Sequence, residues 1–453
     1  MTYKTGSESL IASIRQPKAH RELWQLAAPM MLSNISIATL GLVDTAVIGH
    51  LDDASNLAGI AIAAVIFDFL YWGVTFLRMG TTGVVAQVHG AGDVRRMLST
   101  LRDAMLVALT IAIGMLLFRQ EIISFALNII HSSEQSASHA AQFFAIKIWG
   151  APGVLVTMVF IGWLIGMQNA RSAMWLAALP CALHAALDIA LVSYLKLGIA
   201  GAGYAALATA YFSAGLGLWL VSRELARYKK PVRIGWQWSQ IRQLLTLNSN
   251  ILVRTLCLIA TFAFFTHQGA RQGDTVLAAN AVLLNFQMLT ALALDGFANA
   301  LEALVGASIG ASNRLKFVQV VSVGALWAFL FAMVFVALYL LFGHSLIALL
   351  TSISAVRTQA ERYLVWAAIS PLVSVWCFLF DGIFIGATKG REMRNSMIFS
   401  SFLVFAPAWY VLQHFGNHGL WFAFLLFFAA RGVSMGWYFF AIDRRAGFIR
   451  ATE

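Results

Sequence analysis

The segment GWLIG at Gly162–Gly166 returns 220 residues later as GIFIG at Gly382–Gly386. A second pair, VVAQVHGAGD at Val84–Asp93 and ALVGASIGASN at Ala303–Asn313, aligns a Gly-Ala-Gly turn with a Gly-Ala-Ser turn at the same displacement. Two separate matches at one offset are hard to obtain by chance. We therefore interpret the chain as two repeats of one structural unit.

The composition places both repeats in a membrane. Hydrophobic side chains make up 60% of the 453 residues and charged side chains only 11%, against about 45–50% and about 25% in soluble domains. Such a chain has too little polar surface to cover itself in water. Soluble enzymes, nucleic-acid-binding modules and secreted disulfide scaffolds are therefore excluded.

Twelve apolar windows are long enough to cross a bilayer. Their approximate bounds are 23–48, 56–80, 102–120, 140–167, 174–195, 201–222, 243–267, 276–302, 317–343, 360–386, 396–414 and 419–441. An even number of spans per repeat makes the repeats parallel, with their symmetry axis along the membrane normal. We expect an all-α polytopic membrane protein of twelve transmembrane helices in two parallel six-helix lobes.

The longest connection follows the sixth span and divides the chain in the middle. The predicted domains are an N-lobe at 1–222, a cytoplasmic inter-lobe linker at 223–242 and a C-lobe at 243–453.

The basic residues predict the orientation. The net charge is +11, and with a cytoplasmic N-terminus twenty-two Lys and Arg residues fall inside. Only Arg119, Lys196, Arg271 and Arg357 fall outside. This bias follows the positive-inside rule, so we expect both termini in the cytoplasm. Because the charges are scattered over short connections, a nucleic-acid partner is not expected.

Carboxyl groups inside the apolar windows are the candidates for function. We take as candidates Asp44, Asp68, Asp188, Asp295, Glu302 and Asp381. An ionised side chain at the centre of a spanning helix costs about 2.5–3.5 kcal/mol even on a lenient scale. Each acid must therefore face a wet cavity, pair with a cation or bind a proton.

Asp44 in the first span and Asp188 in the fifth form the sharpest candidate pair. His184 and Asp188 are four residues apart and share one helix face. If the two spans are neighbours, two acids and an imidazole enclose a small polar site. Since two close carboxylates disfavour double ionisation, one of them binds a proton more readily than an isolated carboxyl group.

The second half carries different acids. Asp295 and Glu302 are two helical turns apart on one face, and Asp381 lies in the tenth span. These three residues are secondary candidates, for which structural pairing and function are equally supported. The buried cations that could neutralise acids of the spans are Arg78, Arg254 and Arg431.

Four segments together resemble the multidrug and toxic compound extrusion (MATE) transporters, and in particular their DinF-like branch. They are LWQLAAPMMLSN at 23–34, LVDTAVIGHL at 42–51, RMGTTGVVAQVHGAGD at 78–93 and FDGIFIGATKGREMRNSM at 380–397. The resemblance covers nearly the whole chain. It implies two six-helix lobes arranged in a V and cation-coupled export of cationic or amphipathic drugs.

The resemblance also implies roles for single residues. Asp44 would be the protonation site, Asp188 part of the same network, and Pro29 the point where the first span bends. The implied substrate-binding residues are Asp44, His184, Asp188, Asn34 and Leu40. His184 stands where relatives often have asparagine, and Leu40 where some have tyrosine. Other members use sodium through an acid of the tenth span, for which Asp381 is the counterpart.

The sequence therefore predicts a monomeric, proton-coupled drug antiporter of the bacterial inner membrane that works in membrane lipid. We expect no catalytic residue, no cofactor and no metal, with sodium at Asp381 as the open alternative for the coupling ion. Two other functions remain. One is a flippase for a lipid-linked oligosaccharide, and the other is a membrane-embedded acyltransferase using His184 and Asp188.

Overall fold

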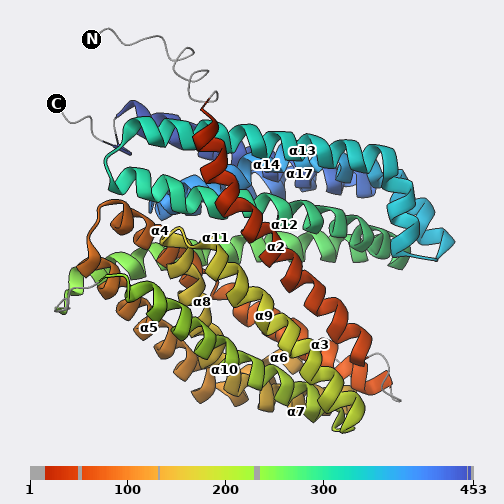
Figure 1. Cartoon of the computed structure of the whole chain (residues 1–453). Coiled ribbons are helices and arrows are strands. Elements are labelled where there is room, and N and C mark those ends of the chain that lie inside the picture. The colour runs from red at the N-terminus through yellow and green to blue at the C-terminus, as the bar shows by residue number, and fades with distance from the viewer. Residues whose placement is uncertain (1–15, 49–53, 131–132, 229–234, 446, 450–453) are drawn as a thin grey trace. The chain divides into compact units, whose positions relative to one another are not determined.

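The computed structural model describes residues 16–48, 54–130, 133–228, 235–445 and 447–449, without the side chains of residues 37–57. All regular structure in these ranges is helical (Figure 1). The α-helices are α2 Pro17–Ile48, α3 Ala54–Gly73, α4 Phe76–Gly90, α5 Val94–Leu117, α6 Arg119–Ile130, α7 Glu134–Lys147, α8 Ala151–Gly166, α9 Ala170–Asp188, α10 Gly198–Leu225, α11 Trp238–Ala270, α12 Asp274–Gly310, α13 Arg314–Leu350, α14 Ser354–Gly386, α15 Gly390–Ile398, α16 Ala406–Leu412 and α17 Gly416–Arg444. Short 3-10 turns are η1 Ile148–Gly150 and η4 Gln413–Phe415, and π-helices are η2 Ile189–Tyr194 and η3 Phe399–Phe405.

The predicted number of spans is confirmed. Among the described residues, ten continuous helical stretches are long and apolar enough to cross a bilayer. The last of them, Gly390–Arg444, is divided by the turn η4 and contains two spans. With α2 at the beginning of the chain, the total is twelve.

The backbone repeats with the displacement of 220 residues that the sequence shows. Three pairs of residues in left-handed conformation are related by it, with φ between 52° and 68°: Gly92 with Ser312, Gln168 with Thr388, and Lys196 with Gly416. The left-handed region is unfavourable for a β-branched residue such as Thr388. Hydrogen bonds at the end of the helix hold Thr388 in this conformation, because the N–H of the next residue, Lys389, donates to the carbonyl of Phe384 at 2.9 Å. The same bond in the first half runs from the N–H of Asn169 to the carbonyl of Leu164.

The repeated glycine motif marks a close approach of two helices in each half. A Cβ atom on Gly162 would lie 2.4 Å from the carbonyl oxygen of Arg78, and one on Gly382 would lie 2.5 Å from that of Ala298. Arg78 and Ala298 are themselves 220 residues apart. Since helices in a membrane associate by van der Waals packing, glycines that let two backbones touch stabilise the contact. The motif therefore positions α4 on α8 and α12 on α14.

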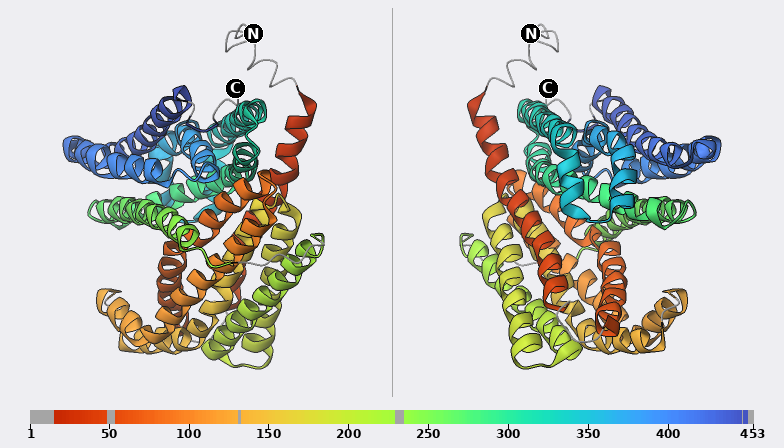
Figure 2. Two further views of the ribbon diagram at one scale, coloured as in Figure 1. Left: turned by 90° about the vertical axis from the view of Figure 1, so that its left-hand side faces the viewer. Right: turned by 90° about the vertical axis from the view of Figure 1, so that its right-hand side faces the viewer.

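The chain divides into two compact units. We call C-unit the described residues of Met1–Met31, Gly90–Gly92 and Thr246–Glu453, and N-unit those of Leu32–His89 and Asp93–Leu245. In the C-unit α14 packs against α12, α13 and α17 (Figures 1 and 2). Buried aromatic rings including Phe265, Trp421 and Phe424 fill its core.

The first turns of α2 belong to the C-unit. Trp24 packs edge-on against Trp327 at 5.1 Å between ring centroids, and the Trp327 indole N–H bonds His20 Nδ1 at 2.9 Å. Lys316 Nζ lies 3.3 Å from a carboxylate oxygen of Glu22. The chain thus begins on the helices of its own second half.

The first turns of α11 show the reciprocal arrangement in the N-unit. Arg96 of α5 donates to the side-chain oxygen of Gln243 at 2.8 Å, and the Ser99 hydroxyl donates to that of Gln240 at 2.8 Å. Arg96 is the repeat counterpart of Lys316. The C-unit therefore contains the first turns of α2, the first helix of the first half. The N-unit contains the first turns of α11, the first helix of the second half.

Candidate functional site

Asp188 is the last residue of α9 and its side chain is almost completely buried, with 1% of the residue exposed. Its carboxylate oxygen Oδ2 lies 3.2 Å from Nε2 of His184, one turn earlier. His184 is also buried. The contact that the spacing predicts is therefore present, and an acid and an imidazole share one buried position in the N-unit.

Two interruptions of the α-helical hydrogen bonding flank this pair. Pro180 lies inside α9, where it has no N–H to donate. The π-helix η2 begins directly after Asp188, and in its ladder Leu195 N–H bonds the carbonyl of Ala190 at 2.9 Å. Single π-turns inside α-helices occur frequently at functional sites. The pair therefore lies where the backbone of the fifth span departs from regular helix on both sides.

The candidates of the first span lie along α2. Pro29 is inside this helix and removes the hydrogen bond that would reach back to the carbonyl of Gln25. Asn34 is half-buried in the N-unit. The side chains of Asp44 and Leu40 lie outside the described residues, so the pairing of Asp44 with Asp188 stays a prediction.

The acid of the tenth span has a different environment. Oδ2 of Asp381 accepts a hydrogen bond from Nη2 of Arg431 and lies 3.2 Å from Nη2 of Arg254. All three side chains are nearly buried, with 11% or less of each exposed. Three helices, α11, α14 and α17, thus bring one carboxylate between two guanidinium groups. The structure thus places Asp381 in ion pairs with two arginines.

The other two acids of the second half belong to the same network. Asp295 and Glu302, both on α12, interact electrostatically with Arg254, and Asp295 also with Arg431. Two guanidinium groups therefore face three carboxyl groups. When all five groups are charged, one negative charge is in excess.

Several polar atoms of this network and of α11 and α14 are buried without a hydrogen-bond partner among the described residues. They are Nε and Nη1 of Arg254, Oδ1 of Asp381, the hydroxyl of Ser374 and both amide atoms of Asn248. Buried polar groups that protein atoms leave unsatisfied are ordinarily bonded by water. The cluster is therefore of a kind that holds internal water molecules.

A sodium ion would require several oxygen ligands around Asp381. Instead, the oxygen Oδ2 already faces two permanently charged guanidinium groups. Within the described part of the chain, no three His, Cys, Asp or Glu side chains are grouped closely enough to hold a metal ion. In this structure Oδ2 of Asp381 is therefore engaged by arginine.

Lys147 is a charged residue of the spans that the sequence interpretation did not consider. Lys147, at the end of α7, places its ammonium group 4.8 Å from the ring centroid of Phe67 and 5.2 Å from that of Phe143. It also interacts electrostatically with Asp68. A lone lysine within the apolar window 140–167 was the available signal. The cation–π contacts and Asp68 together accommodate its charge.

The MatE family model matches residues 29–190 and 250–411, once in each repeat. The chain therefore belongs to the MatE family, the multidrug and toxic compound extrusion transporters. The resemblance inferred from sequence motifs is confirmed.

Similar proteins agree with the DinF-like branch. The chain is 40% identical to DNA damage-inducible protein F of Escherichia coli K12 over 419 residues, which cover 92% of this chain and 91% of that protein. It is 24% identical to the multidrug resistance protein NorM of Vibrio cholerae, covering 93% and 95% of the two chains.

Solved structures share the fold. A crystal structure of MATE in the straight conformation superimposes with a TM-score of 0.85 at 18% identity, covering 98% of this chain and 99% of the other. A transporter of the MOP superfamily from Pyrococcus furiosus gives 0.84 at 18% identity, with the same coverage. At this level of identity the likeness concerns the fold alone.

Proposed function

We propose that this transporter is a proton-coupled antiporter that exports cationic and amphipathic drugs across the bacterial inner membrane. Relatives named as multidrug resistance proteins support the cargo class. The proton as coupling ion rests on the chemistry of the N-unit.

The contrast between two buried acids carries the proposal. One partner of Asp188 is His184, and an imidazole is the side chain that most readily exchanges protons at physiological pH. Asp381 instead faces two guanidinium groups, which stay charged at any physiological pH. Protonating Asp381 would leave two buried permanent cations without the negative charge that they share. Proton exchange is therefore costly at Asp381, and we assign it to the acid beside the imidazole.

The exchange cycle uses one acidic site for two ligands in turn. A drug binds from the cytoplasm while Asp44 or Asp188 is ionised. The two halves of the transporter then rock, and a proton from outside neutralises the acid. α2 bends near Pro29, where a backbone hydrogen bond is already missing, and the drug leaves outward.

The driving force is sufficient for useful export. One proton crossing 100 mV releases about 2.3 kcal/mol, and half a pH unit adds about 0.7 kcal/mol. Because 1.4 kcal/mol corresponds to a factor of ten, about 3 kcal/mol sustains roughly a hundredfold gradient of a neutral drug. A cationic drug that leaves against the potential needs more than one proton for the same gradient.

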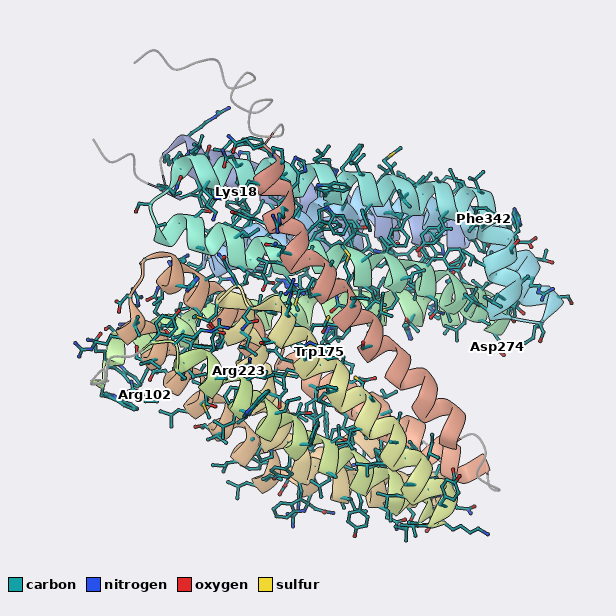
Figure 3. The ribbon with its side chains drawn as sticks, in the orientation of Figure 1. Lys18, Arg102, Trp175, Arg223, Asp274 and Phe342 are labelled. Atoms are coloured by element: carbon teal, nitrogen blue, oxygen red, sulfur yellow. The ribbon has the colours of Figure 1, made fainter. Side chains whose placement is uncertain are left out.

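The orientation is part of the proposal. Within the C-unit, Lys18 lies toward one end, and Asp274 and Phe342 lie at the other (Figure 3). Within the N-unit, Arg102 and Arg223 lie toward one common end of the helices (Figure 3). In each unit, the end that carries these basic residues is the one we assign to the cytoplasm, together with both termini.

The two rival functions lose support. A flippase for a lipid-linked sugar would need free basic side chains for a pyrophosphate, but Arg254 and Arg431 of the C-unit hold Asp381. An acyltransferase would need His184 and Asp188 open to a bulky thioester, but both are buried. Membership of a transporter family also argues against an enzyme.

The proposal is tested by drug-dependent proton exchange in everted membrane vesicles, with and without sodium. We expect Asp44→Asn and Asp188→Asn each to lower the initial exchange rate at least tenfold, because an amide cannot carry the proton. His184→Asn should keep a substantial rate, since a transporter needs the acid and not the imidazole.

Asp68→Asn is the matched control, because it removes a carboxyl group from another span of the same unit and should leave exchange nearly unchanged. Undiminished efflux by Asp44→Asn would refute the proposal. If exchange required sodium, the coupling ion would be sodium and not the proton.

A further inference from the structure

An open groove crosses the surface of the C-unit between two antiparallel helical segments. Its free volume is about 440 Å³, within the range of small-molecule binding sites. One wall is the end of α15 and the start of η3, and the other is α17. The lining residues are Asn395, Ser396, Phe399, Ala430, Val433, Ser434, Trp437 and Tyr438.

The groove has a polar end and an apolar length. At the end nearest the beginning of α15, Arg394 donates from Nε and Nη2 to Oδ1 of Asn395, at 3.1 and 2.9 Å. Its guanidinium group is thereby held at the rim. Farther along, Phe399, Val433 and Trp437 present large apolar surfaces, with 43%, 74% and 65% of each residue exposed.

The repeat shows that this groove is a feature of the second half and not of the shared scaffold. The counterpart of Trp437 is Gly217, where an added Cβ would lie 2.5 Å from the ring of Phe160 and 3.3 Å from Leu176. The counterpart of Asn395 is Trp175, on α9 (Figure 3). At the Gly217 position of the N-unit, helix surfaces are therefore in direct contact.

The floor of the groove is bonded to the buried ion pairs. The hydroxyls of Ser396 and Ser434 lie 2.6 Å apart. Both hydroxyl oxygens also lie within hydrogen-bond distance of the backbone carbonyl oxygen of Arg431, at 3.3 and 3.2 Å. The side chain of Arg431 holds Asp381. A molecule seated in the groove thus contacts residues that position the charged network.

We propose that the groove binds one phospholipid with an anionic head group. The head group lies against Arg394, and an acyl chain runs along Phe399 and Val433 toward the middle of the membrane. The assignment rests on the proposed orientation, which places the beginning of α15 at the cytoplasmic surface. Trp437 and Tyr438 stand at the depth where aromatic residues meet lipid head groups.

Charge favours an anionic lipid over a cationic drug as the occupant. Lys389, Arg391 and Arg394 follow one another within six residues at this end of α15, with Glu392 among them, so the segment keeps a net charge of about +2. Basic clusters between spanning helices on the cytoplasmic side bind anionic head groups. A cationic drug would be repelled by the same charges.

Native mass spectrometry of the full-length protein in detergent tests the proposal. Phosphatidylglycerol and phosphatidylethanolamine with identical acyl chains are added in turn. We expect one molecule of phosphatidylglycerol to remain bound at concentrations where phosphatidylethanolamine dissociates. Arg394→Gln should weaken phosphatidylglycerol binding about fivefold, the contribution of one basic residue at a membrane surface. Val433→Trp should fill the groove and remove the bound lipid.

Arg171→Gln is the matched control, because it removes a basic residue from the beginning of the corresponding helix in the N-unit and should leave binding unchanged. Circular dichroism confirms that each variant is folded. Equal retention of the two lipids by the parent protein, or lipid binding unaffected by Val433→Trp, would overturn the assignment. Displacement of the lipid by a cationic drug would identify a drug site instead. Since no transport is measured, this outcome is independent of the exchange assay.

Discussion

At the scale of single residues, the sequence predicts where an acid lies along a span. It predicts the partner of that acid only when the partner lies on the same helix. His184 and Asp188 touch because residues four apart on a helix are neighbours, which is a local rule. Asp381 meets Arg254 and Arg431 through the packing of three helices. Sequence named the two arginines as possible partners, but rotations of distant helices decided which acid they hold.

The ion pairs of Asp381 predict a large effect on stability. Asp381→Asn removes the charge that two buried guanidinium groups share, so we expect the free energy of unfolding to fall by about 3–5 kcal/mol. Chemical denaturation in detergent micelles measures it. The control is Asp443→Asn at the more exposed pair with Arg314, where the loss should stay below about 1 kcal/mol. Equal losses in the two variants would contradict a buried network.

At the scale of helices, the twelve windows were predictable because a bilayer demands long apolar segments. The interruptions within them were not. Neither the π-helix η2 after Asp188 nor the 3-10 turn η1 before Pro152 follows from hydropathy. Both depend on how neighbouring helices satisfy or strain the backbone. The glycine motif was visible as a repeat, but its role as a contact between α8 and α4 appears only in the structure.

These glycine contacts predict that adding a single methyl group at either glycine pushes the two packed helices apart. In Gly162→Ala and Gly382→Ala the new Cβ would press on a backbone carbonyl, so we expect each to lose about 1–3 kcal/mol of stability. Thermal unfolding in detergent measures the loss. Gly114→Ala, in α5, has open space around the new methyl and should gain about 0.5–1 kcal/mol through helix propensity. If all three variants behaved alike, close packing would not be the reason for the motif.

At the scale of the whole molecule, charge asymmetry predicts which ends of the helices face the cytoplasm. Lys196 and Arg223 flank the two ends of α10, and both are exposed. In a variant without the native cysteines, Lys196→Cys should react with a membrane-impermeant maleimide in intact spheroplasts, whereas Arg223→Cys should react only after permeabilisation. The reverse pattern of labelling would show that the transporter has the opposite orientation in the membrane, and the proposed cycle would then run in the opposite direction.

The first turns of α2 pack in the C-unit and those of α11 pack in the N-unit, and this exchange suggests how such a protein could have arisen. An ancestral chain of six helices folded in this way would have had its first turns seated on a second copy, as His20 lies on Trp327 and Gln240 on Ser99. Neither copy would have been complete alone. Fusion of two such copies would make the dimer covalent and free each half to change separately, as the histidine–aspartate pair of one half and the arginine-bound acid of the other illustrate.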